Sequence, residues 1–261
     1  MITMQETTVV IKKKIKFKKP VLVEGLPGIG LVGKLAADHL IKELKAEKVA
    51  EIISPHFPHQ VLMQKNGVMR MLKNKIYYAK GKKHDILILV GDVQAITSEA
   101  QYEVCGKMLD YFQSCGGTMI YTLGGYGSGK TPEKPRVFGS ASHKHLIAEY
   151  KKLGIVFGES HGSIIGAAGL LLGLGKIRHL EGICLMGETH GAYVDAKSAH
   201  AVLEVLTKIL DVKVDMAKLT ERAKAGEAFM KKMEAEAAKQ KGAAEQQLLP
   251  AGGKSELSYI R

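Results

Sequence analysis

Short apolar runs, each closed by glycine or a polar turn, recur along the chain and predict β-strands. Four of these runs, VLVEG, DILILVGD, TMIYTLGG and GICLMGE, are continuous instead of alternating, which is typical of strands covered on both faces. The predicted strands are Val9–Phe17, Pro20–Glu24, Lys48–Ser54, Val68–Leu72 with Lys75–Ala79 as a hairpin, Asp85–Val90, Thr118–Leu123, Arg136–Phe138 and Gly182–Met186.

Helices are predicted between the strands, where apolar residues recur every three to four positions. In the segment that starts at Ser98, the residues Val104, Met108 and Phe112 share one face, and Ser98 with Gln101 has the pattern of a capping box. Strands that alternate with helices of this length predict an α/β protein, a three-layer α/β/α sandwich with a largely parallel sheet. The predicted helices are Leu31–Ala46, Ser98–Ser114, His143–Leu153, Ser163–Leu174 and Ala196–Leu210.

The fourth of these helices carries a ladder of glycines, at Gly162, Gly166, Gly169 and Gly173. Glycine along one helix face allows a neighbouring element to approach closely, because no side chain stands between the two backbones. We therefore expect this face to pack tightly against another element.

The character of the chain changes after Asp211. The segment Val214–Lys241 is rich in alanine, lysine and glutamate without proline, which predicts a helix, and its apolar residues form a weak heptad stripe. Such a helix either contacts a partner or another copy of the chain, or packs back on its own body. Residues 242–261, GAAEQQLLPAGGKSELSYIR, have no pattern of a folded element and are expected to form a flexible tail. We therefore divide the chain into a body (residues 1–211), a C-terminal helix (residues 212–241) and a tail (residues 242–261).

Composition narrows the class of protein. The chain has 261 residues, of which 46% are hydrophobic and 25% are charged, as in globular proteins. The net charge of +12 favours anionic partners, but six lysines lie within Lys12–Lys19, which fits either a protected edge strand or a phosphate-binding strip. Three isolated cysteines indicate neither a zinc knuckle nor a disulfide framework. The longest apolar run, Ile164–Leu174, is too short to span a bilayer, so we expect a soluble, cytoplasmic protein.

Two glycine-rich stretches resemble phosphate-binding loops. The segment Gly124–Thr131 matches G-x-x-x-x-G-K-[ST], but Pro132 and Pro135 leave no room for the helix that such a loop requires. The stretch Glu24–Lys34 contains G-x-G-x-x-G between a predicted strand and a predicted helix, but leucine follows Lys34 where a magnesium-binding hydroxyl is needed. We expect an exposed loop at the first site, and at the second we keep nucleotide binding only as an alternative.

The sequence GESHG recurs as GETHG, so that Glu188 and His190 follow a predicted strand. A glutamate–histidine pair at the carboxyl end of a strand can do acid–base work or bind a metal, although no nucleophile accompanies it here. His143 and His145 would need a third ligand to bind a metal. The simpler interpretation is that these are turn residues, with Ser160 and Thr189 capping the helices that follow.

Five longer motifs, VLVEGLPGIGLVGKLAADHLI, DILILVGDVQAIT, GGYGSGK, SIIGAAGLLLGLG and LMGETHGAYVDAKSAHAVLEVL, follow one another between Val21 and Leu210. Their order and spacing resemble the proteasome assembly chaperone family, in particular its archaeal members of the B type. The resemblance implies an α/β/α sandwich similar to that of nucleoside phosphorylases, without enzymatic activity or cofactor. It also implies an ATP-independent chaperone that binds proteasome α subunits or the core particle as a homo-oligomer, with a tetramer as one candidate.

In this family, docking to the proteasome is linked to a C-terminal motif of a hydrophobic residue, tyrosine and any residue. Here Tyr259 is third from the end instead of second, and Ser258 precedes it. The alternative function is a small-molecule or nucleotide-binding enzyme, of nucleoside-phosphorylase-like or ligase-like type, that uses Gly28–Lys34 with Glu188 and His190. Nucleic acid is the least favoured partner. The residues expected to bind the partner are Leu219, Phe229, Met230, Met233, Leu257, Tyr259, Ile260 and Arg261.

Overall fold

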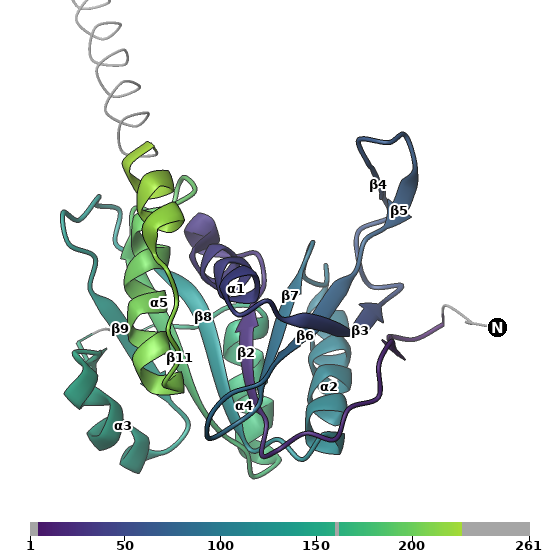
Figure 1. Ribbon diagram of the computed structural model, residues 1–261, viewed down its shortest axis with the longest axis horizontal. Coiled ribbons are helices and arrows are strands. Elements are labelled where there is room, and N and C mark those ends of the chain that lie inside the picture. The colour runs from purple at the N-terminus through teal and green to yellow at the C-terminus, as the bar shows by residue number, and fades with distance from the viewer. Residues whose placement is uncertain (1–4, 160–161, 226–261) are drawn as a thin grey trace, which may run out of the picture. The chain divides into compact units, whose positions relative to one another are not determined.

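The computed structural model describes residues 5–159 and 162–225 of the chain, and in this part a large sheet is flanked by helices (Figure 1). The strands are β1 (Thr8–Ile11), β2 (Val21–Gly25), β3 (Glu47–Ile53), β4 (Val61–Met63), β5 (Met69–Met71), β6 (Asn74–Ala79), β7 (Ile86–Gly91), β8 (Met119–Gly127), β9 (Val137–Ala141), β10 (Val156–Phe157) and β11 (Glu181–Thr189). The helices are α1 (Val32–Glu43), α2 (Ser98–Ser114), α3 (Lys144–Tyr150), α4 (Ala167–Ile177) and α5 (Ala196–Leu210), with 3-10 turns at Ile29–Leu31 and Lys151–Leu153.

The described residues form a sheet with the strand order β1-β3-β6-β7-β2-β8-β11-β9-β10. Its centre is parallel, because β2 pairs in parallel with β7 and β8, and β8 pairs in parallel with β11. Its flanks are antiparallel, from β7 outward to β1 on one side and between β11 and β9 on the other. Every residue of β2 and β7 is buried, in agreement with their continuous apolar runs.

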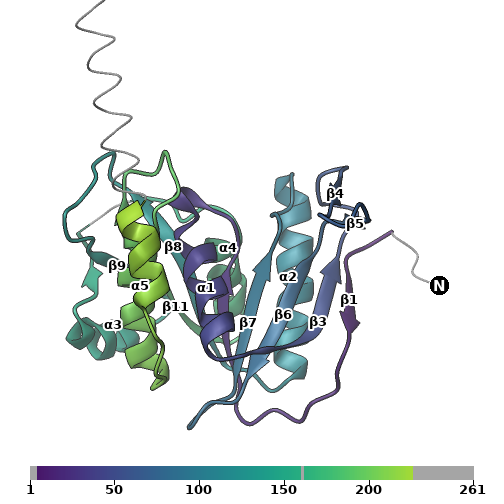
Figure 2. The same ribbon diagram turned by 45° about the horizontal axis from the view of Figure 1, so that its top comes forward.

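Helices cover both faces of the sheet, which confirms the predicted three-layer α/β/α sandwich. Figure 2 shows α1 and α5 on one side and α2 and α4 on the other. Two hydrophobic cores correspond to these layers. One contains Ala36 of α1 and Val202 of α5, and the other contains Met108 of α2 and Leu171 of α4.

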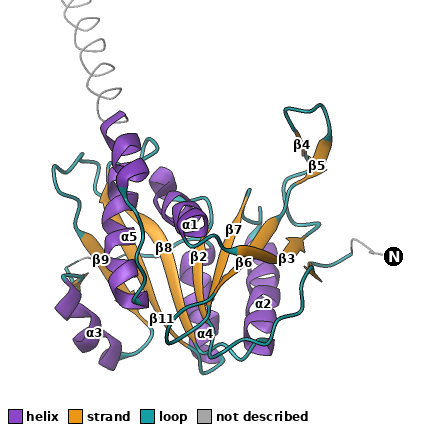
Figure 3. Cartoon of the chain, in the orientation of Figure 1, coloured by secondary structure: helices purple, strands orange, loops and turns teal. Residues whose placement is uncertain are grey.

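The predicted hairpin is wrong. Strand β5 pairs with β4, which the sequence analysis missed, whereas β6 pairs with β3 and β7 in the main sheet. The turn between β4 and β5 contains Asn66 and Gly67, with Gly67 at φ +80°, a dipeptide that favours tight hairpin turns. Figure 3 shows this small hairpin standing away from the sheet.

Strand β1 lies at the edge of the sheet but is shorter than predicted, so that Lys12–Lys19 follow the strand instead of belonging to it. Lys13 forms an ion pair with Glu47, and Lys12 lies 3.5 Å from the carboxylate of Glu51. Both acidic residues belong to β3, the neighbouring strand. Lys12 and Lys13 therefore have acidic partners within the chain.

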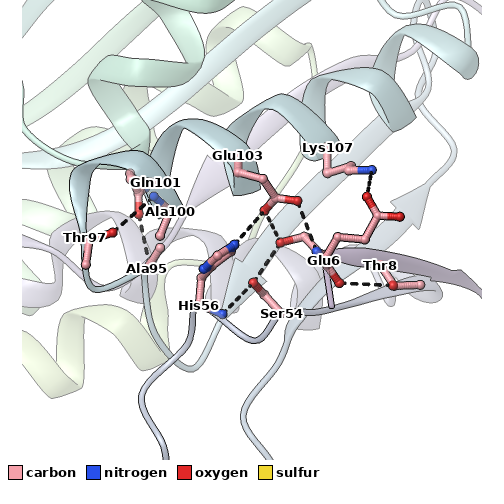
Figure 4. A network of polar contacts seen from close by, with 11 residues as sticks. Glu6, Thr8, Ser54, His56, Ala95, Thr97, Ala100, Gln101, Glu103 and Lys107 are labelled. Carbon is pink, nitrogen blue, oxygen red and sulfur yellow. Dashed lines mark hydrogen bonds and ion pairs between the residues drawn. The ribbon is translucent and has the colours of Figure 1, made fainter. Parts of the chain in front are cut away.

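Helix α2 has the predicted bounds but a different cap. The N-cap is Thr97, whose backbone is extended and whose hydroxyl accepts a hydrogen bond from the Ala100 amide at 3.3 Å. Gln101 accepts a hydrogen bond from the Ala95 amide at 3.0 Å, before the helix (Figure 4). The predicted capping box of Ser98 with Gln101 is therefore wrong. The N-cap lies one residue earlier, at Thr97, whose side chain accepts the hydrogen bond from the first turn of the helix.

The chain beyond α5 returns to the core. Residues 217–225 are helical, and Leu219 is fully buried in the hydrophobic core that also contains Val202 and Leu206. Nε2 of His39 lies 2.6 Å from the Asp215 carbonyl oxygen, which ties this segment to α1. Leu219 was expected to be an adhesive surface position. Its burial corrects that expectation for this residue, because the core already covers its side chain.

Candidate functional site

The glycine-rich stretch after β2 is a packing junction. A Cβ atom at Gly33 would lie 2.1 Å from the Leu123 carbonyl oxygen, and one at Gly25 would lie 2.4 Å from the Gly33 carbonyl oxygen. Gly30 has φ +61°, and its carbonyl oxygen accepts a hydrogen bond from the Asp195 amide at 2.9 Å. The Lys34 ammonium pairs with Asp38 one turn further along α1. The glycines therefore serve close contact between α1 and the sheet.

The second glycine-rich stretch continues β8 and then leaves the sheet. Gly124, Gly125 and Gly127 are strand residues, and the chain from residue 128 to residue 136 is not helical. This confirms that Thr131 does not begin a helix. Lys130 is exposed, and the Thr131 hydroxyl lies 2.7 Å from the Tyr193 hydroxyl. The structural context of a phosphate-binding loop is therefore missing here.

Glu188 and His190 have separate partners. Glu188 forms an ion pair with Arg136 at 3.0 Å, and the Arg136 guanidinium lowers the pKa of Glu188. The His190 ring stacks on Tyr193 with 5.4 Å between the ring centroids. Their described contacts therefore do not join them into an acid–base pair.

The H-x-H motif has no metal-binding geometry among the described residues. Nδ1 of His143 lies 2.8 Å from the Ser142 hydroxyl, and His145 lies 3.0 Å from the carboxylate of Glu181. Across residues 5–159 and 162–225, no group of three or more histidines, cysteines, aspartates and glutamates is arranged to hold a metal ion. Within the same ranges, no helix combines the length and apolar character needed to cross a bilayer.

Among the expected partner-binding residues, Leu219 belongs to the described part of the chain. Leu219 lies in the core, as described above. Phe229, Met230, Met233, Leu257, Tyr259, Ile260 and Arg261 all lie outside the described residues.

A cavity of about 1050 Å³ opens at the carboxyl ends of β2, β8 and β11, next to the first turns of α2 and α4. This is the edge of a parallel sheet where α/β proteins place ligands. Its walls are largely apolar, and the cavity also borders the glycines of α4.

A Cβ at Gly173 would meet no atom within 4 Å, so the predicted tight packing of the glycine ladder is wrong at this position. The glycine leaves space instead of making a contact.

Glu24 lines this cavity and is only 1% exposed. Its Oε1 accepts a hydrogen bond from the Leu26 amide at 2.8 Å, whereas Oε2 has no hydrogen-bond partner within the described part of the chain. Burial raises the pKa of Glu24 to about 8, and the Leu26 hydrogen bond only partly offsets this. Glu24 was not among the predicted site residues, although a lone acid inside the apolar run VLVEG is a usable signal.

The comparisons with known proteins agree with one another. The model of the PAC2 family matches residues 22–234. The uncharacterized protein MJ1210 of Methanocaldococcus jannaschii is 39% identical over 228 residues, which cover 86% of this chain and 88% of that protein.

Two crystal structures from Pyrococcus furiosus are also similar. PbaB, described as an archaeal proteasome activator, is 47% identical with a TM-score of 0.84, covering 88% of this chain and 100% of that one. PbaA, described as an archaeal homolog of proteasome-assembly chaperone, is 27% identical with a TM-score of 0.74, covering 93% and 98% of the two chains. Because the family model matches most of the length of this chain, the chain belongs to the PAC2 family.

Proposed function

We propose that this chain is a non-enzymatic, ATP-independent proteasome assembly chaperone that binds the proteasome core particle or its α subunits. The observation that carries proteasome binding is the similarity to PbaB, described as an archaeal proteasome activator, which extends over the whole of that chain at 47% identity. The assembly-chaperone role rests on the similarity to PbaA, described as an archaeal homolog of proteasome-assembly chaperone, at 27% identity. The two glycine-rich stretches support the proposal indirectly. One is used for packing and the other lacks the helix of a phosphate-binding loop, so neither offers the described geometry of a nucleotide site.

Binding is assigned to the C-terminal helix and tail, with Tyr259, Ile260 and the carboxylate of Arg261 at the point of contact. Phe229, Met230 and Met233 add apolar surface, and methionine suits an adaptable interface. Self-association into a homo-oligomer presents several tails at once, so that a weak contact of each tail is multiplied by high local concentration. Leu219 is left out of this surface because it is buried.

The test is binding to purified archaeal proteasome core particle on a sensor surface. Deletion of Gly242–Arg261 is expected to abolish measurable binding while the melting temperature of the body stays unchanged. Tyr259→Ala is expected to weaken binding roughly thirtyfold, as for an aromatic hot spot worth about 2 kcal/mol. Ser255→Ala, in the same tail, is the matched control and is expected to bind like the parent chain. Undiminished binding after the deletion would contradict the proposal.

A further inference from the structure

The strand register places the buried carboxyl group at the centre of the sheet. Glu24 on β2 is paired with Thr122 on β8, and Thr122 is paired with Cys184 on β11. These three side chains form a row on the face of the sheet that α2 and α4 cover, because the alternate residues Leu22 and Ile120 belong to the core beneath those helices. Two residues further along the strands, Gly124 and Met186 also line the cavity. The row therefore lies next to the cavity.

Two glutamine side chains that line the cavity already have hydrogen-bond partners. Gln94 donates to the Pro27 carbonyl at 2.7 Å and accepts from the Ala167 amide at 2.8 Å. Gln101 donates to Gln94 at 3.2 Å and accepts from the Ala95 amide at 3.0 Å. These bonds hold the loop after β2 and the starts of α2 and α4 together. Oε2 of Glu24 still lacks a hydrogen-bond partner, as does the buried hydroxyl of Thr122 beside it in the row, and of these two residues only Glu24 lines the cavity.

The electrostatics of the cavity depend on one group. Among its described lining residues, Glu24 is the single side chain that is an aspartate, glutamate, lysine, arginine or histidine. Cys105 on α2 and Cys184 on β11 are the titratable groups that interact with it, and burial raises the pKa of each thiol to about 12, so both stay neutral near pH 7. An ionised Glu24 therefore has no cation of the protein beside it, and a buried unpaired charge is costly.

The mouth of the cavity is apolar and open. Side chains with 51% to 88% of their surface exposed stand around it, and these are Ile29, Ile96, Tyr102, Ile165 and Ile177. Tyr126 adds a second aromatic ring to the wall. Aromatic faces attract cations as well as apolar groups. A volume of about 1050 Å³ is sufficient for a drug-sized organic molecule.

We propose that this cavity binds an organic cation, a primary amine on an apolar body, with the Glu24 carboxylate as its counter-ion. The amine donates a hydrogen bond to Oε2, which supplies the missing partner and compensates the buried charge. The apolar body contacts the isoleucines and tyrosines of the wall. The same chemistry is available from a free amine or from a lysine side chain of a bound polypeptide. This inference is independent of proteasome binding.

The test uses matched pairs of small molecules with the full chain, by titration calorimetry. Phenethylamine is compared with 2-phenylethanol, which has the same body without the charge. Because the pKa of Glu24 is about 8, the affinity for the amine is expected to rise roughly tenfold from pH 6 to pH 7, as the ionised fraction of Glu24 grows. The affinity for the alcohol is expected to show no such rise.

Two variants locate the site. Glu24→Gln is expected to remove the rise with pH and to leave binding of the alcohol unchanged. Gly173→Leu fills the cavity from α4, where an added side chain has room, and is expected to weaken both ligands at least tenfold. Gly106→Leu on α2 is the matched control, because an added Cβ there would meet only the Arg178 side chain at 3.6 Å and Gly106 does not line the cavity. It is expected to change neither affinity.

A second arm distinguishes the two sources of the amine. A capped Leu-Lys-Leu peptide is compared with its norleucine analogue, and preference for the lysine peptide over phenethylamine identifies a side chain as the natural occupant. Either source supports the proposal. Equal affinities for amine and alcohol at every pH, no binding of any amine, or pH-dependent amine binding that persists in Glu24→Gln would overturn it.

Discussion

The two faces of the sheet use the same residue types for opposite purposes. On the face that α1 and α5 cover, Gly33 allows backbone contact with β8, whereas on the α2 and α4 face Gly173 borders open space. The buried carboxyl groups differ in the same way. Asp195, at the start of α5, accepts hydrogen bonds from Thr189 and Ser198, whereas Glu24 has one partner. One face is packed and satisfied, and the other holds a cavity with an unsatisfied acid.

The largest expected effect that separates the two faces is the pH dependence caused by Glu24. Its pKa is raised from 4.5 to about 8 in the folded chain, so the folded state holds this proton more tightly than the unfolded state. The contribution of Glu24 to the free energy of unfolding therefore falls as pH rises from about 4.5 to about 8, by on the order of 5 kcal/mol.

Glu24→Gln removes this titration. Relative to the parent chain, the variant is expected to gain stability steadily across that pH range, as measured by urea unfolding at several pH values. A constant stability difference between the two proteins from pH 5 to pH 9 would show that Glu24 is not a strained buried acid.

The next largest effect is expected at the packed junction. Gly33→Ala places a Cβ atom 2.1 Å from the Leu123 carbonyl oxygen, a backbone atom that cannot rotate away. The helix and the sheet must separate, at a cost of about 3 kcal/mol. Urea unfolding at one pH measures the change, and a stability equal to that of the parent chain would mean that α1 does not touch β8 as described.

The N-caps of α5 and α2 allow the two faces of the sheet to be compared through a smaller effect on stability. Asp195→Ala leaves the Thr189 hydroxyl and the Ser198 amide without their acceptor, and is expected to cost about 2 kcal/mol. Thr97→Ala removes one hydrogen bond of 3.3 Å at the start of α2, and is expected to cost about 1 kcal/mol. Thermal unfolding of the two variants side by side provides the measurement. A larger loss of stability in Thr97→Ala than in Asp195→Ala would contradict the distinction between the two faces.

The smallest effect is expected at Gly173, in the middle of α4. Alanine there meets no atom within 4 Å and has the higher helix propensity, so Gly173→Ala is expected to be neutral or to stabilise the chain by up to about 1 kcal/mol. A rise in the midpoint of thermal unfolding supports this. Marked destabilisation would indicate that this glycine is a contact site after all.

The sequence was most informative where local signals agree. Helices α2 and α5 have the predicted bounds, because their apolar residues recur at helical spacing. The expected caps were wrong in both cases, since α5 is capped by Asp195 and Thr189 is the last residue of β11. The cap of α2 shifted to Thr97 because Thr97 and Ser98 are both suitable caps, and only the extended backbone of Thr97 decides between them. Strand β5 was predicted, but its partner β4 was missed because three residues are too few for a clear alternation.

The candidate site depends on contacts between distant segments, which a single sequence does not reveal. Glu24 becomes unusual only because β8, β11, α2 and α4 assemble around it. Leu219 matched an apolar stripe, but a stripe does not say whether the chain's own core or a partner covers it. The family, in contrast, was predictable, because five motifs in fixed order carry information that no single motif carries.

We propose that this member of the PAC2 family binds proteasome subunits through its C-terminal segment. Size-exclusion chromatography with light scattering, on the full chain mixed with purified archaeal proteasome α subunits, tests it most directly. We expect a complex whose mass is the sum of a homo-oligomer of this chain and bound α subunits, and no such complex after deletion of Gly242–Arg261. Separate elution of the two proteins at micromolar concentration, or a complex that survives the deletion, would contradict it.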